Sequence, residues 1–175
     1  SPGRDWNVAT GMVIEGKAGF QIMGDWAKGE FTAAGKTPGV DYYCAATPSN
    51  NGYLYNVDSF IFYKTSDPDK QAGQKLLAKL MMGKNFQKVF NLYKGSIPAR
   101  LDVPMDEFDD CAKASNADIK TSGAKGGLVP SFAHGMAQGN TMKAALQDVI
   151  TEHFNSDMSS KDAANALADS VLQNM

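Results

Sequence analysis

The 175-residue sequence has only two cysteines and two histidines, and none of its apolar runs approaches the length of a membrane span. Two distant cysteines and two distant histidines lack the spacing of metal ligands, so we expect neither a metal site nor a cofactor. Phosphate-binding loops, dinucleotide fingerprints, zinc-protease motifs and the nucleophile elbow of hydrolases are all absent from the sequence. The formal net charge is -2 without a dense cluster of lysine and arginine, which argues against a nucleic-acid partner.

What remains is the composition of one ordinary globular domain, with 43% hydrophobic and 21% charged residues in a chain long enough to bury a real core. The sequence has no internal repeat, low-complexity tract or proline-rich linker. It begins with Ser1 and Pro2 rather than with methionine, so we expect a processed or truncated chain. The missing signal peptide then says nothing about export.

In the first third of the chain, apolar patterning predicts one helix and several strands. The helix covers residues 6–15, with Asp5 as its N-cap. Residues 27–39 have little periodicity and are predicted to be loop with at most one turn of helix, and residues 47–52 form a turn cluster. Runs of apolar, aromatic and β-branched residues predict buried strands over residues 20–23, 40–46 and 53–63.

The rest of the chain is predicted to be mostly helical. Asp67 and Pro68 are typical of a helix start, and apolar residues including Met81 and Met82, predicted to lie in the core, follow at helical spacing. Gly83 interrupts this pattern before a second helix. Further segments are a helical stretch containing Cys111, an exposed polar stretch over 116–127, an apolar loop over 128–135 and two closing amphipathic helices.

Residues 16–26, Gly-Lys-Ala-Gly-Phe-Gln-Ile-Met-Gly-Asp-Trp, resemble a motif of the carbohydrate-binding receptors of bacterial ABC importers, the family 1 extracellular solute-binding proteins. In that family a Gly-Lys-Ala strand leads into Gly-x-Trp, and the tryptophan stacks on the sugar. The later order of an Asp-Pro helix, a second helix and an Ile-Pro-Ala-Arg loop at 97–100 is also similar. The resemblance covers nearly the whole chain, is strongest to glucose-binding members and corresponds to the carboxy-terminal part of such a receptor.

This resemblance implies an α/β fold, the carboxy-terminal part of a two-lobe periplasmic-binding-protein-like fold. Residues 1–48 and 101–175 would belong to the carboxy-terminal lobe and residues 50–98 to the other lobe. The resemblance also implies export to the periplasm. From the residues alone, Cys44 and Cys111 are either two buried thiols or a disulfide, and export favours the disulfide.

Sugars are recognised by polar groups that bind hydroxyls and by an aromatic face that covers the C–H groups of the ring. The chain offers Trp26, Asp58, Lys94 and His134 outside its obvious core patterns. The resemblance implies that Trp26 stacks on a pyranose, that Asp58 accepts hydrogen bonds from its hydroxyls, and that Lys94 and His134 donate to them. Taken singly, each residue also has a structural explanation, such as a core tryptophan or a solvated lysine at a helix end.

The resemblance therefore implies a receptor without catalytic residues that delivers a monosaccharide, by likeness glucose, to an ABC transporter permease. Its partners would be the sugar, the permease and the missing amino-terminal part of the same protein. The alternative is a non-catalytic interaction or chemosensory domain on the same fold. A hydrolase using Asp58 with Glu30, or with Ser131 and His134, is a weaker alternative, because no second placed acid and no nucleophile elbow support it.

Overall fold

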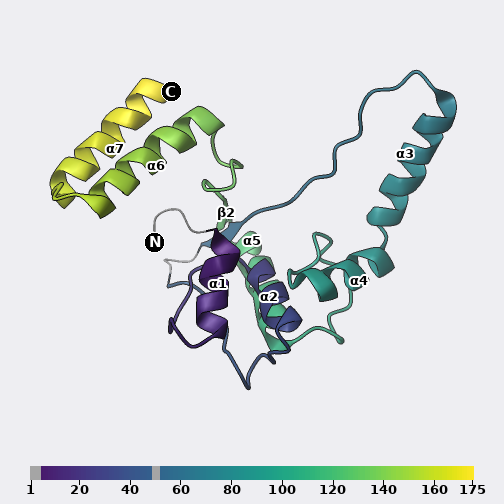
Figure 1. The fold of residues 1–175 in the computed structure, drawn as a ribbon. Coiled ribbons are helices and arrows are strands. Elements are labelled where there is room, and N and C mark those ends of the chain that lie inside the picture. Colours follow the sequence, from purple (N-terminus) through teal and green to yellow (C-terminus); the bar gives the residue numbers. More distant parts are fainter. Residues whose placement is uncertain (1–4, 49–51) are drawn as a thin grey trace. The chain divides into compact units, whose positions relative to one another are not determined.

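The computed structural model describes residues 5–48 and 52–175, so residues 49–51 of the predicted turn lie outside it (Figure 1). The chain divides into two compact units. The first contains the described residues up to 48 together with Val57–Gly127. The second contains Gly52–Asn56 and Leu128–Met175. The predicted α/β class is confirmed, with helices predominating over a small parallel sheet.

The first unit is helical, and two of its helices have clear sequence causes. The Asp67 side chain accepts hydrogen bonds from the backbone N–H groups of Asp69 and Lys70, which confirms the predicted helix start at Pro68. The following helix ends at Lys94 and is capped by Gly95, whose φ of 88° is the left-handed value that glycine adopts without strain. In chain order the elements are α1 (Trp6–Ile14), the 3-10 helix η1 (Asp25–Ala27), α2 (Lys28–Ala33), α3 (Pro68–Met81), α4 (Lys84–Lys94) and α5 (Asp110–Ala124).

The core of the first unit lies around the start of α5. Val103, Phe108 and Ala112 form a buried cluster there, onto which neighbouring apolar side chains pack. The predicted disulfide between Cys44 and Cys111 is present, with its Cα atoms 5.6 Å apart, and it ties α5 to the segment that follows α2.

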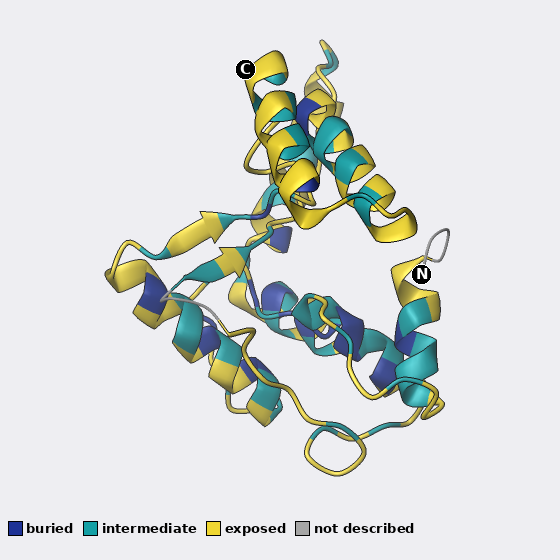
Figure 2. Cartoon of the chain, turned by 90° about the vertical axis from the view of Figure 1, so that its left-hand side faces the viewer, coloured by how far each residue is buried: buried dark blue, intermediate teal, exposed yellow. Residues whose placement is uncertain are grey.

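The second unit consists of a two-stranded sheet and a helical hairpin. β1 (Tyr53–Tyr55) and β2 (Leu128–Pro130) pair in parallel with Leu54 opposite Val129, and Figure 2 shows the two strands side by side. The two predicted closing helices are confirmed as α6 (Asn140–Asn155) and α7 (Ser160–Asn174), which pack against each other. The Ser159 hydroxyl accepts a hydrogen bond from the Asp162 N–H and so caps α7, as its position in the sequence predicts.

The strand predictions are wrong except at one place. Residues 20–23 form no strand, and Phe20 and Ile22 are 95% and 83% exposed. Residues 40–46 contain only one end of an isolated bridge between Pro38 and Tyr42. Of residues 53–63, only the first three pair with another strand, as β1. Strand propensity reflects packing on a sheet, and within the described residues these segments have no neighbouring strand to pair with.

Three other expectations also need correction. Residues 27–39 contain more helix than the single turn that the prediction allowed, because α2 occupies Lys28–Ala33. Most of the stretch 116–127 lies in α5 with Asn116 and Ser122 buried, and the predicted loop at 128–135 begins with β2. Met81 is buried as predicted, whereas Met82 is exposed at the helix end. Tertiary contacts, such as those described below for α2, determine these elements and their burial. A short stretch of sequence gives no information about such contacts.

Candidate functional site

Trp26 lies in η1 with its ring folded back over Gly24. A Cβ atom built on Gly24 would overlap carbon atoms of the indole ring, so only glycine leaves room for this arrangement. The tryptophan is half-buried and therefore retains accessible surface. The Gly-x-Trp spacing seen in the sequence thus has a physical cause, because the glycine provides the space in which the ring is held.

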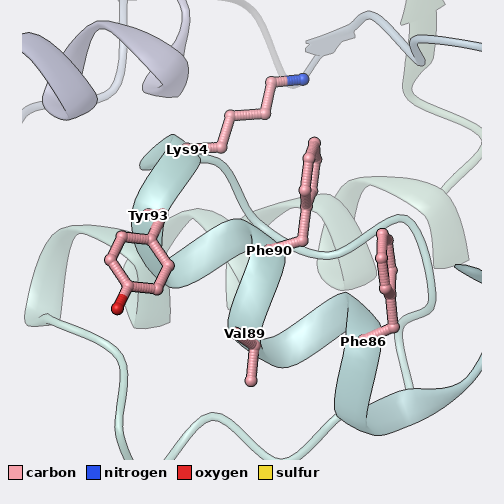
Figure 3. Close-up of a pocket in the computed structure, with 5 residues that line it drawn as sticks. All are labelled: Phe86, Val89, Phe90, Tyr93 and Lys94. Atoms are coloured by element: carbon pink, nitrogen blue, oxygen red, sulfur yellow. The ribbon is translucent and has the colours of Figure 1, made fainter.

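Lys94 and Asp58 lie together although 36 residues separate them in the sequence. The Lys94 ammonium forms an ion pair and a hydrogen bond with Asp58 Oδ2. Lys94 is the last residue of α4 and its Nζ lies 5.9 Å from the centre of the Phe90 ring (Figure 3). Because the Asp58 side chain is exposed, this pair presents charged donors and acceptors side by side to solvent, the kind of group that binds neighbouring hydroxyls.

The end of α4 is in close backbone contact with the segment that follows Trp26. A Cβ atom on Gly29 would lie 2.8 Å from the carbonyl oxygen of Lys94, and one on Gly95 would lie 2.6 Å from the Gly29 nitrogen. The Ile97 N–H donates a 2.8 Å hydrogen bond to Asp25 Oδ2, which crosses the same junction. The fold therefore brings Lys94 to the segment that carries Trp26.

Asp25 is the titratable group most altered by this junction. Burial raises the pKa of the Asp25 carboxyl, since desolvation disfavours its charged form. The hydrogen bond from Ile97 and the positive charges of Lys28 and Lys94 act in the opposite direction without cancelling the effect on the pKa. Burial at the junction therefore outweighs the opposing charges in setting the pKa of Asp25.

His134 belongs to the second unit, in the loop after β2. Its Nδ1 lies 2.6 Å from the Ser131 hydroxyl, while the imidazole itself is exposed. Ser131 is buried, and its N–H donates to the carbonyl of Tyr55, which extends the pairing of β1 with β2. A serine nucleophile must be accessible, so this Ser–His pair fits a loop that orients the histidine better than it fits a hydrolase.

An apolar hollow lies along α4 and includes Lys94 of the ion pair in its lining. Phe86 and Phe90 stack with their ring centres 5.6 Å apart, and Val89, Tyr93 and Lys94 complete the lining (Figure 3). Exposed leucines of α3 border a neighbouring hollow. This face of α4 therefore offers aromatic surface next to the Lys94–Asp58 pair.

Sequence reasoning missed the residues that assemble the junction, namely Asp25, Gly29 and the Lys28–Asp109 pair. The Lys28 ammonium lies 2.8 Å from both carboxylate oxygens of Asp109 and is buried. A lysine and an aspartate 81 residues apart carry no joint signal in one sequence. Asp25 lies inside the Gly-Asp-Trp motif. This position next to Trp26 was the one local indication that Asp25 takes part in the junction.

None of the helices in the described part of the chain combines the length and apolarity needed to cross a membrane. Residues 3–119 match the bacterial extracellular solute-binding protein family. A probable sugar-binding periplasmic protein of Brucella suis is 49% identical over 170 residues, which cover 97% of this chain and 40% of that protein. A protein of the same description from Rhizobium meliloti is 45% identical over 97% of this chain and 41% of its own length.

A xylose/arabinose-binding protein of Haloferax volcanii is 29% identical over 166 residues, which cover 92% of this chain and 34% of that protein. The chain thus spans about 40% of the length of the Brucella and Rhizobium relatives that it matches. The family match extends across the Trp26 segment, the Lys94–Asp58 pair and both half-cystines. The chain belongs to the bacterial extracellular solute-binding protein family.

Proposed function

We propose that this chain is part of a periplasmic receptor that binds a sugar and delivers it to the membrane permease of an ABC transporter. The observation that carries the proposal is the Lys94–Asp58 pair, which is held at the segment of Trp26 in a chain 49% identical to a probable sugar-binding periplasmic protein. The receptor performs no chemistry on its ligand. Its work is to enclose the sugar and to release it to the permease.

Each residue has a role that its surroundings support. Trp26 covers the C–H face of the sugar ring, since part of its surface is accessible and its ring is fixed over Gly24. Asp58 accepts from one hydroxyl while Lys94 donates to its neighbour, because their charged ends already lie together. His134, exposed and oriented by Ser131, donates to a further hydroxyl. We assign a monosaccharide of the glucose type as the ligand.

The receptor closes around its sugar when two lobes rotate about a hinge, and the ligand stabilises the closed state. We assign residues 1–48 and 101–175 to one lobe and residues 50–98 to the other. The amino-terminal part of the longer protein completes the site. Large exposed apolar side chains support this, since surface of that kind is usually covered by a partner; they include Phe20, Ile22, Phe60, Ile61 and Tyr63.

The test uses a chimera in which these 175 residues replace the matched 40% of the Brucella suis relative, with the unaltered relative as reference. Tryptophan fluorescence and calorimetry are recorded during titration with glucose, galactose, mannose, xylose and maltose. We expect saturable binding of one monosaccharide. Lys94→Met and Asp58→Asn should each weaken it about 10- to 100-fold, the range of a hydrogen bond to a charged group.

The matched control is Lys88→Met on the same helix, which removes the ion pair between Lys88 and Glu107 and should leave the affinity unchanged. If the reference protein binds a sugar and the folded chimera binds none, the receptor proposal is wrong for this chain. A non-catalytic interaction domain on the same fold is then the better assignment. If the chimera binds sugar and neither Lys94→Met nor Asp58→Asn weakens that binding, the roles of these two residues are wrong and the receptor function stands.

A further inference from the structure

Asp25 is a carboxylate that the proposed sugar contacts do not include. It lies between Gly24 and Trp26, and its Oδ2 accepts a hydrogen bond from the N–H of Ile97, 72 residues further along the chain. The backbone N–H of Trp26 also donates to this carboxylate. One side chain therefore contacts both the residue that carries the indole and the loop that follows Lys94.

The loop after α4 has little freedom at this junction. Gly95, Ser96 and Pro98 are buried, and the backbones of Gly95 and Gly29 approach so closely that a side chain on either would collide. Ile97 lies in the middle of this loop and is held by Asp25. Because Lys94 directly precedes the loop, any shift of residues 95–98 away from η1 moves the end of α4 and the Lys94 ammonium with it.

The hydrogen-bond acceptors of Asp25 matter more at this junction than its charge. Burial alone disfavours the ionised form, and an asparagine oxygen would accept the same hydrogen bonds. The ionised carboxylate is, however, close enough to Lys28 and Lys94 for their charges to stabilise it. Lys28 and Lys94 each have a carboxylate partner of their own, Asp109 and Asp58, so the role of Asp25 rests on its hydrogen bond from Ile97.

We propose that Asp25 is a positioning residue of the sugar site, which ties loop 95–98 to η1 and thereby holds Lys94 in place against the segment of Trp26. This inference rests on the proposed function of Lys94 and Trp26. It assigns no direct contact with the sugar to Asp25. Loss of Asp25 should therefore change the surroundings of Trp26. It should also remove the part of the sugar affinity that Lys94 contributes and no more.

The first part of the test needs no sugar and uses the 175-residue chain. The sequence has two tryptophans, so Trp6→Phe leaves Trp26 as the only indole that fluoresces. In this background, Asp25→Ala should shift the emission of Trp26 to longer wavelength and raise its quenching by acrylamide. Asp25→Asn, which keeps an acceptor for Ile97, should restore most of both signals. Asp41→Ala is the control, because Asp41 also accepts a backbone hydrogen bond, from Thr37, and is itself exposed.

The second part measures sugar affinity in the Brucella chimera. Asp25→Ala should weaken binding about tenfold. Adding it to Lys94→Met should weaken binding by less than a further twofold, since the two residues act as a unit. A merely structural role would instead multiply the two losses. If Asp25→Ala does not fold, Asp25→Ser, which is too short to reach Ile97, replaces it in both parts.

The outcomes separate the two proposals. The role of Asp25 is overturned if Asp25→Ala gives the same Trp26 fluorescence and the same sugar affinity as Asp41→Ala. That result would not contradict the proposed receptor function. Independent losses for Asp25→Ala and Lys94→Met overturn it as well. A chimera that binds no sugar refutes the receptor, while the response of Trp26 in the isolated chain still decides whether Asp25 holds the junction.

Discussion

Removing either partner of the Lys28–Asp109 ion pair should destabilise the first unit, and the two removals should differ. The Lys28 ammonium contacts both oxygens of Asp109 at 2.8 Å, and the two side chains are 8% and 35% exposed, respectively. Asp109 is also the N-cap of α5, where it accepts a hydrogen bond from Ala112. Asp109→Ala therefore removes a helix cap and leaves a buried ammonium without its acceptor.

Breaking a buried pair in this way costs about 3–5 kcal/mol, and loss of the cap costs about 1 kcal/mol more. Lys28→Met should cost less, about 1–3 kcal/mol, because it preserves the buried alkyl chain. The carboxylate it leaves behind is partly hydrated and still bonded to Ala112. The double variant should be more stable than the sum of the two losses predicts, since it leaves no unpaired buried charge.

The assay is urea unfolding under non-reducing conditions, which keep the disulfide intact. Unfolding is followed by tryptophan fluorescence, because Trp6 and Trp26 both lie in the first unit. The control removes the exposed pair of Lys113 and Asp110, whose charged atoms lie 3.7 Å apart on the same helix. Lys113→Met should change the free energy of unfolding by less than about 0.5 kcal/mol. Equal and similarly small losses for Asp109→Ala and Lys28→Met would refute the assignment of a buried, structurally important pair.

Three further predictions concern the disulfide, Tyr42 and Gly24. Replacing Cys44 and Cys111 by serine should lower the free energy of unfolding by about 4 kcal/mol, the chain-entropy value for a 67-residue separation, measured as a shift in the urea midpoint. Burial and the charge of Asp109 raise the pKa of Tyr42 to about 12 in the folded protein. Because the unfolded tyrosine ionises at about pH 10, the stability that the neutral form confers is complete below pH 10 and falls between pH 10 and 12. Tyr42→Phe should remove that share of the alkaline loss in pH-dependent unfolding, and at pH 7 it should not destabilise, because the buried hydroxyl has no hydrogen-bond partner among the described residues. Gly24→Ala should displace the Trp26 ring, seen as increased acrylamide quenching, and should weaken sugar binding by the chimera about tenfold, the scale of one lost aromatic contact.

Most of the helices, though neither α2 nor the full length of α5, were predictable because their signals lie within a few residues of each other. The Asp67–Pro68 start of α3, the Gly83 interruption before α4 and the Ser159 cap of α7 are all local hydrogen-bonding or dihedral preferences. Strands depend on a partner that lies elsewhere in the chain. Phe20 and Ile22 have the apolar character of a buried strand, yet in the described structure they are exposed and unpaired.

The candidate site residues came from the resemblance rather than from spacing. No single-sequence rule pairs Asp58 with Lys94, and none connects Asp25 with Ile97 or Lys28 with Asp109. Each of these contacts joins segments that the fold brings together from 36 to 81 residues apart. The sequence indicates which side chains have the right chemistry, and tertiary structure decides which of them meet.

The region around Trp26 and Lys94 is assembled chiefly by close approach of backbones. Gly24 gives its space to the indole, while Gly29 and Gly95 let α2 meet the end of α4 without intervening side chains. Such a junction has almost no room to adjust, since a single methyl group at any of the three positions would meet another atom of the protein. An interaction that spans it, such as the one from Asp25 to Ile97, therefore fixes position more than it adds stability. The receptor proposed above would need charged groups placed in this way to distinguish sugars by the orientation of single hydroxyls.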